Sequence, residues 1–232
     1  MRIRTLPTLF TFALSIAASP ALTAAANEAT PITQCMPITQ SGSFVLANNL
    51  FIANSDCLAI RAEFVTIDLA GFLIVGNGLV AGIFNRSGSS PRGIVVRNGT
   101  ISNFTFGILI RGNGTIVEKV RVFGNTSQGV TVLGTGIVRD NIAEGNGGCG
   151  ICGDIGIVTG NIARDKGSVG IRFGQGILKG NFVTNNADGI VITSGGSTVS
   201  GNTAIANNVL AGNHTGISVT CPANVHREHG HD

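Results

Sequence analysis

Hydrophobic and polar residues alternate in short segments along this chain. In the segment 62–78, Val65, Ile67 and Leu69 fall on one face of an extended strand, and Thr66 and Asp68 fall on the other. The segment 93–104 repeats the arrangement. Between them, residues 79–92 contain Ser-Gly-Ser-Ser-Pro and break the period, so we expect a loop there that leaves the regular structure.

A Gly followed by a β-branched residue recurs through the second half of the chain. It occurs at intervals that shorten from 22 to 19 residues between Gly107 and Gly189, and again at Gly216. A second phrase, ending in Asn, keeps nearly the same period, at Asn141, Asn161, Asn181 and Asn202. Two independent marks with one period indicate a repeat architecture of about 20 residues per unit.

A period near 20 residues admits a leucine-rich horseshoe or a β-helix. The repeat has Ile and Val at short alternating positions with Gly and Asn between them, and it lacks the leucine-rich consensus. We therefore predict an all-β fold, a single-stranded parallel β-helix with about 20–22 residues per coil. Residues one period apart then stack, and Asn141, Asn161, Asn181 and Asn202 form an asparagine ladder at a bend. A looser second column holds Asn125, Asn146, Asn186 and Asn207, interrupted by Lys166.

The N-terminal segment has the composition of an export signal. Arg2 and Arg4 precede an apolar run from Leu9 to Ala18, and ALTAAA ends at Ala26. This is the pattern of a secretory signal peptide over residues 1–26, and the run is too short for a membrane anchor. We expect a secreted or periplasmic protein without a transmembrane span after signal removal, with a β-helix and its N-terminal cap over 27–221 and a flexible, His-bearing tail over 222–232.

The phrases CMPITQSGSFVLANNLFIANSDCLAI, FVTIDLAGFLIVGNG and VVRNGTISNFTFGI precede the Gly-Ile and Gly-Asn coils. Together they resemble the right-handed parallel β-helix repeat proteins of the pectate-lyase-like superfamily, and more narrowly its exported bacterial members. The resemblance runs from about Cys35 to Cys221. It implies the fold rather than one activity, because that superfamily mixes lyases, hydrolases, epimerases, adhesins and periplasmic accessory proteins.

The five cysteines gain meaning under this fold. Cys35 and Cys57 lie about one coil apart, within reach of a disulfide, and we predict that bridge. Cys149 and Cys152 form a CGIC motif whose ends lie roughly 10 Å apart in an extended strand, too far for a bridge unless Gly150 turns the chain. A local disulfide, stacked thiols, metal binding and redox function all stay open for this pair. Cys221 has no obvious partner.

Enzymes on this fold bring carboxylates into register on neighbouring coils. Here no two acids share a column on neighbouring coils; Glu118 instead stacks with Arg139, and Glu144 with Arg164, as surface ion pairs. The chain also lacks Trp and Tyr, the usual sugar-binding platforms. The weak catalytic candidates are Asp140, Arg164 and Asp165, which belong, with Arg139, Glu144 and Lys166, to the densest charged patch, and a solvated surface explains that patch as well.

Three histidines, at His226, His229 and His231, gather at the C-terminus and are weak candidates for a transition-metal site. We expect no obligate cofactor, with calcium or a transition metal as the alternative. A net charge of +3 without clustering gives no footprint for nucleic acid. The chain ends where another coil should start, so an open C-terminal coil could self-associate.

Three functional hypotheses follow. The first is an exported, non-catalytic β-helix that acts as a surface, scaffold or binding protein, contacting a polysaccharide or another cell-surface component. The second is a polysaccharide-active enzyme of the lyase, hydrolase or epimerase type. The third is a periplasmic, metal-linked accessory protein that uses the His tail or the CGIC motif.

Overall fold

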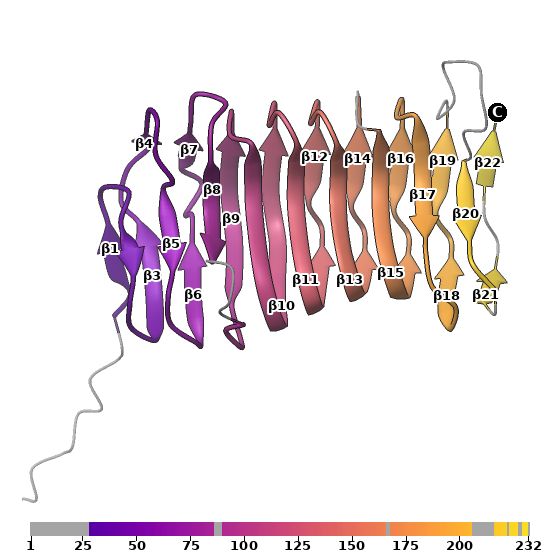
Figure 1. The fold of residues 1–232 in the computed structure, drawn as a ribbon, viewed down its shortest axis with the longest axis horizontal. Helices are drawn as coiled ribbons and strands as arrows, with labels where there is room; N and C mark the ends of the chain where they lie inside the picture. Colours follow the sequence, from indigo (N-terminus) through magenta and orange to yellow (C-terminus); the bar gives the residue numbers. More distant parts are fainter. Residues whose placement is uncertain are drawn as a thin grey trace, which may run out of the picture.

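The protein is a parallel β-solenoid of about 8 turns, seen in a computed structural model that describes residues 28–85, 90–165, 168–205, 216–221, 223–226 and 229–231. The described part of the chain contains 22 strands and no helix, and every strand pair is parallel. The coils stack side by side from the indigo N-terminal end to the yellow C-terminal end (Figure 1). The predicted all-β coil with Asn-bearing bends is confirmed.

Each coil has three faces, which we name A, B and C, and the chain visits them in the order C, A, B. Face A contains β1 (Thr30–Ile32), β3 (Gly42–Leu46), β6 (Val65–Asp68), β18 (Ser197–Ser200) and β21 (Ala223–His226). Face B contains β4 (Leu50–Phe51), β7 (Leu73–Val75), β12 (Ile142–Glu144), β14 (Ile162–Arg164), β16 (Phe182–Thr184), β19 (Thr203–Ile205) and β22 (His229–His231). Face C contains β2 (Pro37–Ile38), β5 (Leu58–Ile60), β8 (Ala81–Asn85), β17 (Asp188–Ile192) and β20 (Ile217–Val219).

Five longer strands bend around the corners between faces. β9 (Val95–Ser102) runs through faces A and B, and β10 (Phe106–Phe123) runs through C, A and B. β11 (Gln128–Arg139), β13 (Cys149–Thr159) and β15 (Val169–Lys179) run through C and A. The middle of the solenoid therefore has the longest continuous strands.

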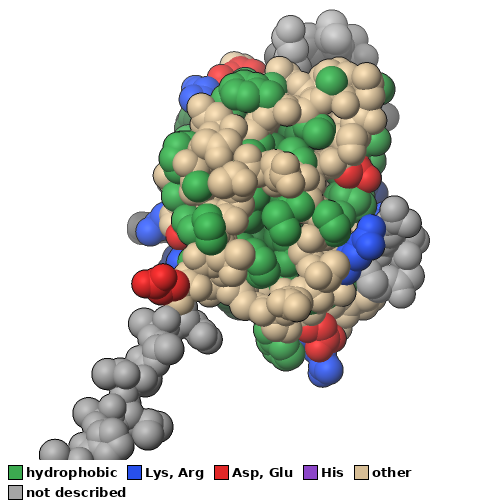
Figure 2. All heavy atoms as spheres, turned by 90° about the vertical axis from the view of Figure 1, so that its left-hand side faces the viewer, with side chains coloured by type: hydrophobic (Ala, Val, Ile, Leu, Met, Phe, Trp, Pro, Cys, Tyr) green, Lys and Arg blue, Asp and Glu red, His purple; other side chains and the backbone are tan. Residues whose placement is uncertain are grey.

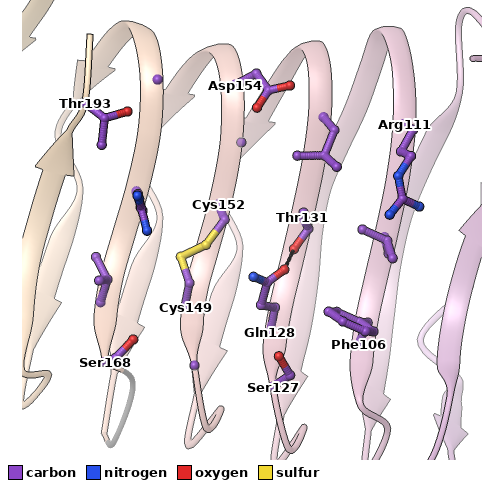
Figure 3. Close-up of a pocket in the computed structure, with 17 residues that line it drawn as sticks. Phe106, Arg111, Ser127, Gln128, Thr131, Cys149, Cys152, Asp154, Ser168 and Thr193 are labelled. Atoms are coloured by element: carbon purple, nitrogen blue, oxygen red, sulfur yellow. Dashed lines mark hydrogen bonds between the residues drawn. A yellow bond between two sulfur atoms is a disulfide. The ribbon is translucent and has the colours of Figure 1, made fainter. Parts of the chain in front are cut away.

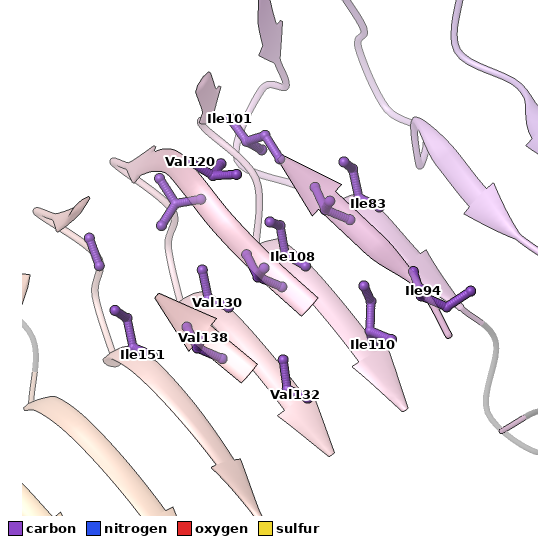
Figure 4. Packing of buried hydrophobic residues seen from close by; sticks show 14 of the residues in the cluster. Ile83, Ile94, Ile101, Ile108, Ile110, Val120, Val130, Val132, Val138 and Ile151 are labelled. Atoms are coloured by element: carbon purple, nitrogen blue, oxygen red, sulfur yellow. The ribbon is translucent and has the colours of Figure 1, made fainter. Parts of the chain in front are cut away.

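Stacked aliphatic side chains fill the interior of the coil. The alternation in the sequence points every second residue inward, and residues one coil apart meet at the strand spacing of about 4.8 Å. Figure 4 shows such stacks, including Ile108, Val130 and Ile151 from face C. Face A contributes a fully buried column: Ile67, Val96, Val117, Val138, Val158, Leu178 and Val199. Burial of this kind of surface is the main favourable term for folding.

The expected loop over 79–92 is wrong for residues 81–85. These residues form β8, which pairs with β5 and β10 on face C. Ala81, Ile83 and Asn85 are buried, and Asn85 exchanges two hydrogen bonds with the backbone of Arg111. The breaking signal Ser-Gly-Ser-Ser-Pro begins only after the strand, and residues 86–89 lie outside the described part.

The expected flexible tail over 222–232 is also wrong for its described residues. β21 pairs with β18, and β22 pairs with β19, so the coil continues beyond Cys221. The physical reason is the unpaired edge of the preceding coil, whose backbone N–H and C=O groups gain partners when the chain makes one more turn. The predicted signal peptide over residues 1–26 falls outside the described residues.

The N-terminal end of the described solenoid presents the coil in which β1 pairs with β3 and with no other described strand. Figure 2 views this end, where hydrophobic side chains reach the surface among polar atoms and charged side chains lie toward the rim. No helix in the described part of the chain is long and apolar enough to cross a membrane.

Candidate functional site: a groove on the outside of face C

A groove of about 490 Å³ lies on the outside of face C. It crosses β10, β11, β13 and β15 and ends beside Thr193, just after β17 (Figure 3). Its lining follows three rows that run along the solenoid, each row taking one residue from each of these four coils. The rows are Phe106, Gln128, Cys149 and Val169; Leu109, Thr131, Cys152 and Arg172; and Arg111, Leu133, Asp154 and Gly174.

A glycine in each coil makes the first two rows point the same way. In a regular strand, residues three apart lie on opposite faces, and here Gly107, Gly129, Gly150 and Gly170 interrupt the alternation. A Cβ at any of these positions would stand within 3 Å of the carbonyl oxygen of the equivalent glycine one coil later. The Gly of the recurring Gly-Ile phrase is therefore required by the close approach of neighbouring coils, and the residues one position before it and two positions after it both line the groove.

Cys149 and Cys152 use this bend to form a disulfide within one strand. Their Cα atoms lie 6.1 Å apart, whereas residues three apart in a straight strand lie roughly 10 Å apart. The turn at Gly150 that a bridge between these residues requires is therefore present. In the preceding coil the same two positions hold Gln128 and Thr131, and the Thr131 hydroxyl donates to Gln128 Oε1 at 2.5 Å (Figure 3). Of the options left open by the sequence, the structure has the local disulfide.

The charged groups of the groove are Arg111, Arg172 and Asp154. Asp154 Oδ2 accepts a hydrogen bond from the Gly134 N–H at 2.9 Å. Neither arginine side chain forms an ion pair with a described residue, whereas five arginines elsewhere on the described surface do so: Arg92, Arg97, Arg121, Arg139 and Arg164. The groove therefore carries two cationic groups that the described protein does not itself neutralise.

The sequence candidates Asp140, Arg164 and Asp165 lie outside this groove. Asp140 stands at the corner between faces A and B, and Asp165 at the corner between faces B and C, each with a positive φ, near 57° and 62°. Arg164 contacts both Asp165, at 3.6 Å, and Glu144, at 3.3 Å. The structure thus joins Arg164 to Asp165, while Asp140 occupies a left-handed turn position that Gly160, Gly180 and Gly201 hold in later coils.

Both predicted ion pairs are present. Arg139 Nε donates to Glu118 at 2.7 Å, and Arg164 contacts Glu144. Arg121, from the coil before Glu144, also reaches it at 2.8 Å, a contact that the sequence analysis missed. The hydrogen bond from Arg121, aided by Arg164, lowers the pKa of Glu144 against the opposing effect of its partial burial. The ion pairs of Glu144 with Arg121 and Arg164 therefore link three neighbouring coils.

The predicted bridge between Cys35 and Cys57 is confirmed, with Cα atoms 4.4 Å apart. Cys57 is buried in the core, and Cys35 packs against it, so this disulfide ties the first coil to the second. Cys221 is a free, exposed thiol.

The predicted asparagine ladder is confirmed atom by atom at the corner between faces A and B. Each Asn side chain donates its amide to Oδ1 of the next: Asn141 to Asn161 at 3.0 Å, Asn161 to Asn181 at 3.0 Å, and Asn181 to Asn202 at 2.8 Å. The same Oδ1 atoms accept the backbone N–H groups of the preceding Asn residues. All four side chains are buried.

The second column follows the corner between faces B and C. Asn125 donates to Asn146 at 2.8 Å, and Asn186 donates to the carbonyl oxygen of Ala163. Lys166 and Asn207 lie outside the described residues. Both columns have a structural role, because their side-chain amides form hydrogen bonds with one another and with the backbone.

The C-terminal histidines fall on two faces. His226 ends β21 on face A, in register with Ser200, while His229 and His231 lie in β22 on face B, in register with Thr203 and Ile205. Within the part of the chain whose side chains are described, no three His, Cys, Asp or Glu residues come together as a metal-binding group.

Comparison with protein-family models, with curated proteins and with solved structures found no match to this chain.

The groove residues Arg111, Asp154 and Arg172 were not singled out from the sequence. The repeat period does contain the information on where these residues lie in the coil. Asp154 aligns by period with Gly134 and Gly174, and the row that contains Arg111 is found with the same alignment. The sequence pattern does not reveal the bend at each Gly-Ile phrase. This bend places residues from both of its sides on one surface.

Proposed function

We propose that the protein is an exported β-helix of the pectate-lyase-like type that binds an extended acidic polymer, such as a cell-surface polysaccharide, in the groove of face C. The observation that carries this proposal is the pair of arginines, Arg111 and Arg172, which line the groove without an ion-pair partner among the described residues. Guanidinium groups bind carboxylates with two parallel hydrogen bonds and so favour an acidic ligand.

The spacing of the two arginines favours a polymer over a small anion. Arg111 lies in the coil of β10 and Arg172 in the coil of β15, three coils later. At about 4.8 Å per coil, their strands lie roughly 14 Å apart along the solenoid. One extended chain can reach both, and the side chains of Gln128, Ser127 and Ser168 lie along the way as hydrogen-bonding groups.

Export is supported by the N-terminal signal pattern, and the two disulfides are compatible with an extracellular protein. The N-terminal sequence of the mature protein after secretion tests the predicted signal.

The binding proposal is tested by isothermal titration with alginate and polygalacturonate, with dextran as the neutral control. The double variant Arg111→Ala/Arg172→Ala should weaken binding of the acidic polymers at least about tenfold, because each charged hydrogen bond contributes about 1.5–3 kcal/mol. The matched control, Arg121→Ala/Arg139→Ala, removes the same charge outside the groove and should leave the affinity nearly unchanged. Equal losses in the two variants would reduce the effect to net charge and reject the groove as the site.

Incubation of the same polymers with the protein, with and without calcium, tests the catalytic alternative. Cleavage that disappears in Asp154→Asn but persists in Asp140→Asn would replace binding with catalysis in the groove. Cleavage that depends on Asp140 would return the site to the charged corners predicted from the sequence.

A further inference from the structure

The fold of the coil does not require a covalent cross-link at the position of the groove disulfide. In the neighbouring coils, the same two positions hold residues with no covalent bond between them: Phe106 and Leu109, Gln128 and Thr131, Val169 and Arg172, and Asp188 and Val191. These coils keep the same register and the same bend. The fold therefore tolerates this position without a covalent link.

The two disulfides of the protein also differ in what they constrain. Cys35 and Cys57 are 22 residues apart and join successive coils, whereas Cys149 and Cys152 are three residues apart in one strand. A disulfide stabilises a fold mainly by restricting the unfolded chain, and a loop this short restricts it little. The Cys149–Cys152 bond thus adds the smaller share of stability.

Access to the two sulfur atoms is through the groove. Cys149 and Cys152 have exposed fractions of only 6% and 8%, but both line the groove, and Figure 3 shows their yellow S–S bond among the other lining side chains. Cys57 is buried as well, whereas Cys35 is half-buried and the two line a separate, smaller cavity at the first coils. The Cys149–Cys152 bond is therefore distinguished by its place in the groove of face C and by its three-residue loop, not by exposure alone.

The nearest charged residue in the strand register is Arg172, which stands directly beside Cys152 on the next coil. A guanidinium on the neighbouring strand stabilises the negative charge that develops on a departing sulfur. The carboxylate of Asp154, two residues further along β13, is engaged with the Gly134 N–H of the preceding coil, on the other side from Arg172. Cys152 is therefore the better leaving thiolate of the pair.

We propose that Cys149–Cys152 is a thiol–disulfide exchange site for low-molecular-weight thiols that enter the groove. The thiolate of a first thiol attacks Cys149 Sγ, the Cys149–Cys152 bond breaks, and Cys152 leaves as a thiolate beside Arg172. The thiolate of a second thiol then attacks the small-molecule sulfur of the mixed disulfide, the bond from that sulfur to Cys149 Sγ breaks, and Cys149 leaves as a thiolate that takes up a proton. The products are one small-molecule disulfide and the reduced Cys149 and Cys152, so two thiols are oxidised and one protein disulfide is reduced.

The test uses the mature protein with Cys221→Ser, which removes the free thiol, and glutathione as the probe. The protein is equilibrated in buffers of increasing ratio of reduced to oxidised glutathione without denaturant, alkylated, and analysed by peptide mass spectrometry; circular dichroism follows the fold. We expect Cys149–Cys152 to be reduced at a glutathione ratio at least about tenfold lower than Cys35–Cys57, with an unchanged β-sheet spectrum. The second disulfide is the internal control.

The variant Arg172→Gln tests the assigned direction of attack. It should slow reduction by glutathione about threefold to tenfold, since the leaving thiolate loses its cation, whereas Arg139→Gln should not change the rate. Reduction of both disulfides at the same ratio, or reduction of Cys149–Cys152 only after the fold is lost, would overturn the proposal and make the bond a structural cross-link. An unchanged rate in Arg172→Gln would remove the role of that arginine. Because glutathione is the only ligand present, these results do not depend on polymer binding.

Discussion

The corner between faces A and B and the outside of face C are built by the same chain with the same period, yet they follow opposite rules. At the corner the same residue, Asn, returns in four coils, and each copy bonds to the next. In the groove each coil brings a different pair, from Phe106 and Leu109 to Val169 and Arg172. Residues that bond to their own copies must repeat, whereas residues that face solvent are free to differ, and this freedom is where function can be encoded.

The largest effect is expected from breaking the corner at Asn161. Asn161→Ala leaves the Asn141 N–H and side-chain amide without their buried acceptor, and the Val138 carbonyl oxygen without a donor. Each such loss costs about 1–3 kcal/mol, so we expect a loss of about 3–5 kcal/mol in the free energy of unfolding, measured by urea denaturation. The exposed Asn113→Ala is the control and should cost less than about 1 kcal/mol. Similar costs for the two would show that the ladder adds nothing beyond surface hydrogen bonds.

The next largest effect is expected from the bond between the first coils. Replacing Cys35 and Cys57 together by Ser should lower the stability by about 3 kcal/mol, as expected for a loop of this length. Thermal unfolding followed by circular dichroism measures the change. A variant as stable as the parent would contradict a stapling role for this disulfide.

A smaller effect of opposite sign is expected inside the coil at Thr115. Its hydroxyl is fully buried and has no hydrogen-bond partner among the described residues. Thr115→Val keeps the shape and removes the unsatisfied group, so we expect stabilisation by about 1 kcal/mol in urea denaturation. Ser197→Ala is the contrasting change, since the Ser197 hydroxyl accepts a bond from the Gly176 N–H and its removal should destabilise.

A pH-dependent effect is expected on the outside of face A at Asp68. Burial alone would raise the pKa of Asp68, but hydrogen bonds from the Ala70 N–H, Asn98 and Arg97 outweigh it and lower the pKa below the usual 3.8. A carboxylate with a lowered pKa stabilises the folded state above its unfolded value, and this contribution is lost as the pH falls through the folded value. The melting temperature should therefore fall less steeply in Asp68→Asn than in the parent below about pH 4. Parallel profiles would exclude Asp68 as a source of acid sensitivity.

The smallest effect is expected in the groove. Cys149→Gln/Cys152→Thr installs the pair of the preceding coil, including its hydrogen bond between the two side chains. Because neighbouring coils keep the bend without a bond, stability should change by about 1 kcal/mol or less. A loss as large as that of the Cys35 and Cys57 variant would show that the groove disulfide carries the fold, and the contrast between corner and groove would fail.

The sequence predicted the features that repeat and missed those that depend on one coil. The Asn columns, the pair Glu118–Arg139 and the bridge Cys35–Cys57 all follow from the period alone, because stacking one coil on the next fixes each partner. The strand at 81–85 was missed because a turn-forming segment directly after it hid one short alternation.

The groove could be predicted even less. Its existence depends on the bend at Gly150 and its equivalents, which the phrase Gly-Ile marks without revealing the direction of the turn. Arg111 and Arg172 have no ion-pair partner among the described residues, and this depends on which carboxylates lie near them in space. A periodic alignment of the sequence shows only which residues stack on neighbouring coils, so it does not predict this feature. The scaffold could therefore be predicted from the sequence, whereas the groups that line the groove depend on contacts in three dimensions.

The asparagine ladder has a direction. In Asn141, Asn161 and Asn181, one amide N–H donates to the Asn of the next coil toward the C-terminus, and the other donates back to a backbone carbonyl oxygen of the preceding coil. During synthesis, which proceeds from the N-terminus, the newest corner of this stretch lacks its acceptor until the following Asn has been made and wound into place. Each new coil therefore supplies the hydrogen-bond acceptor for the Asn of the coil before it. A chain cut between two of these Asn residues ends on a corner whose amide lacks that acceptor.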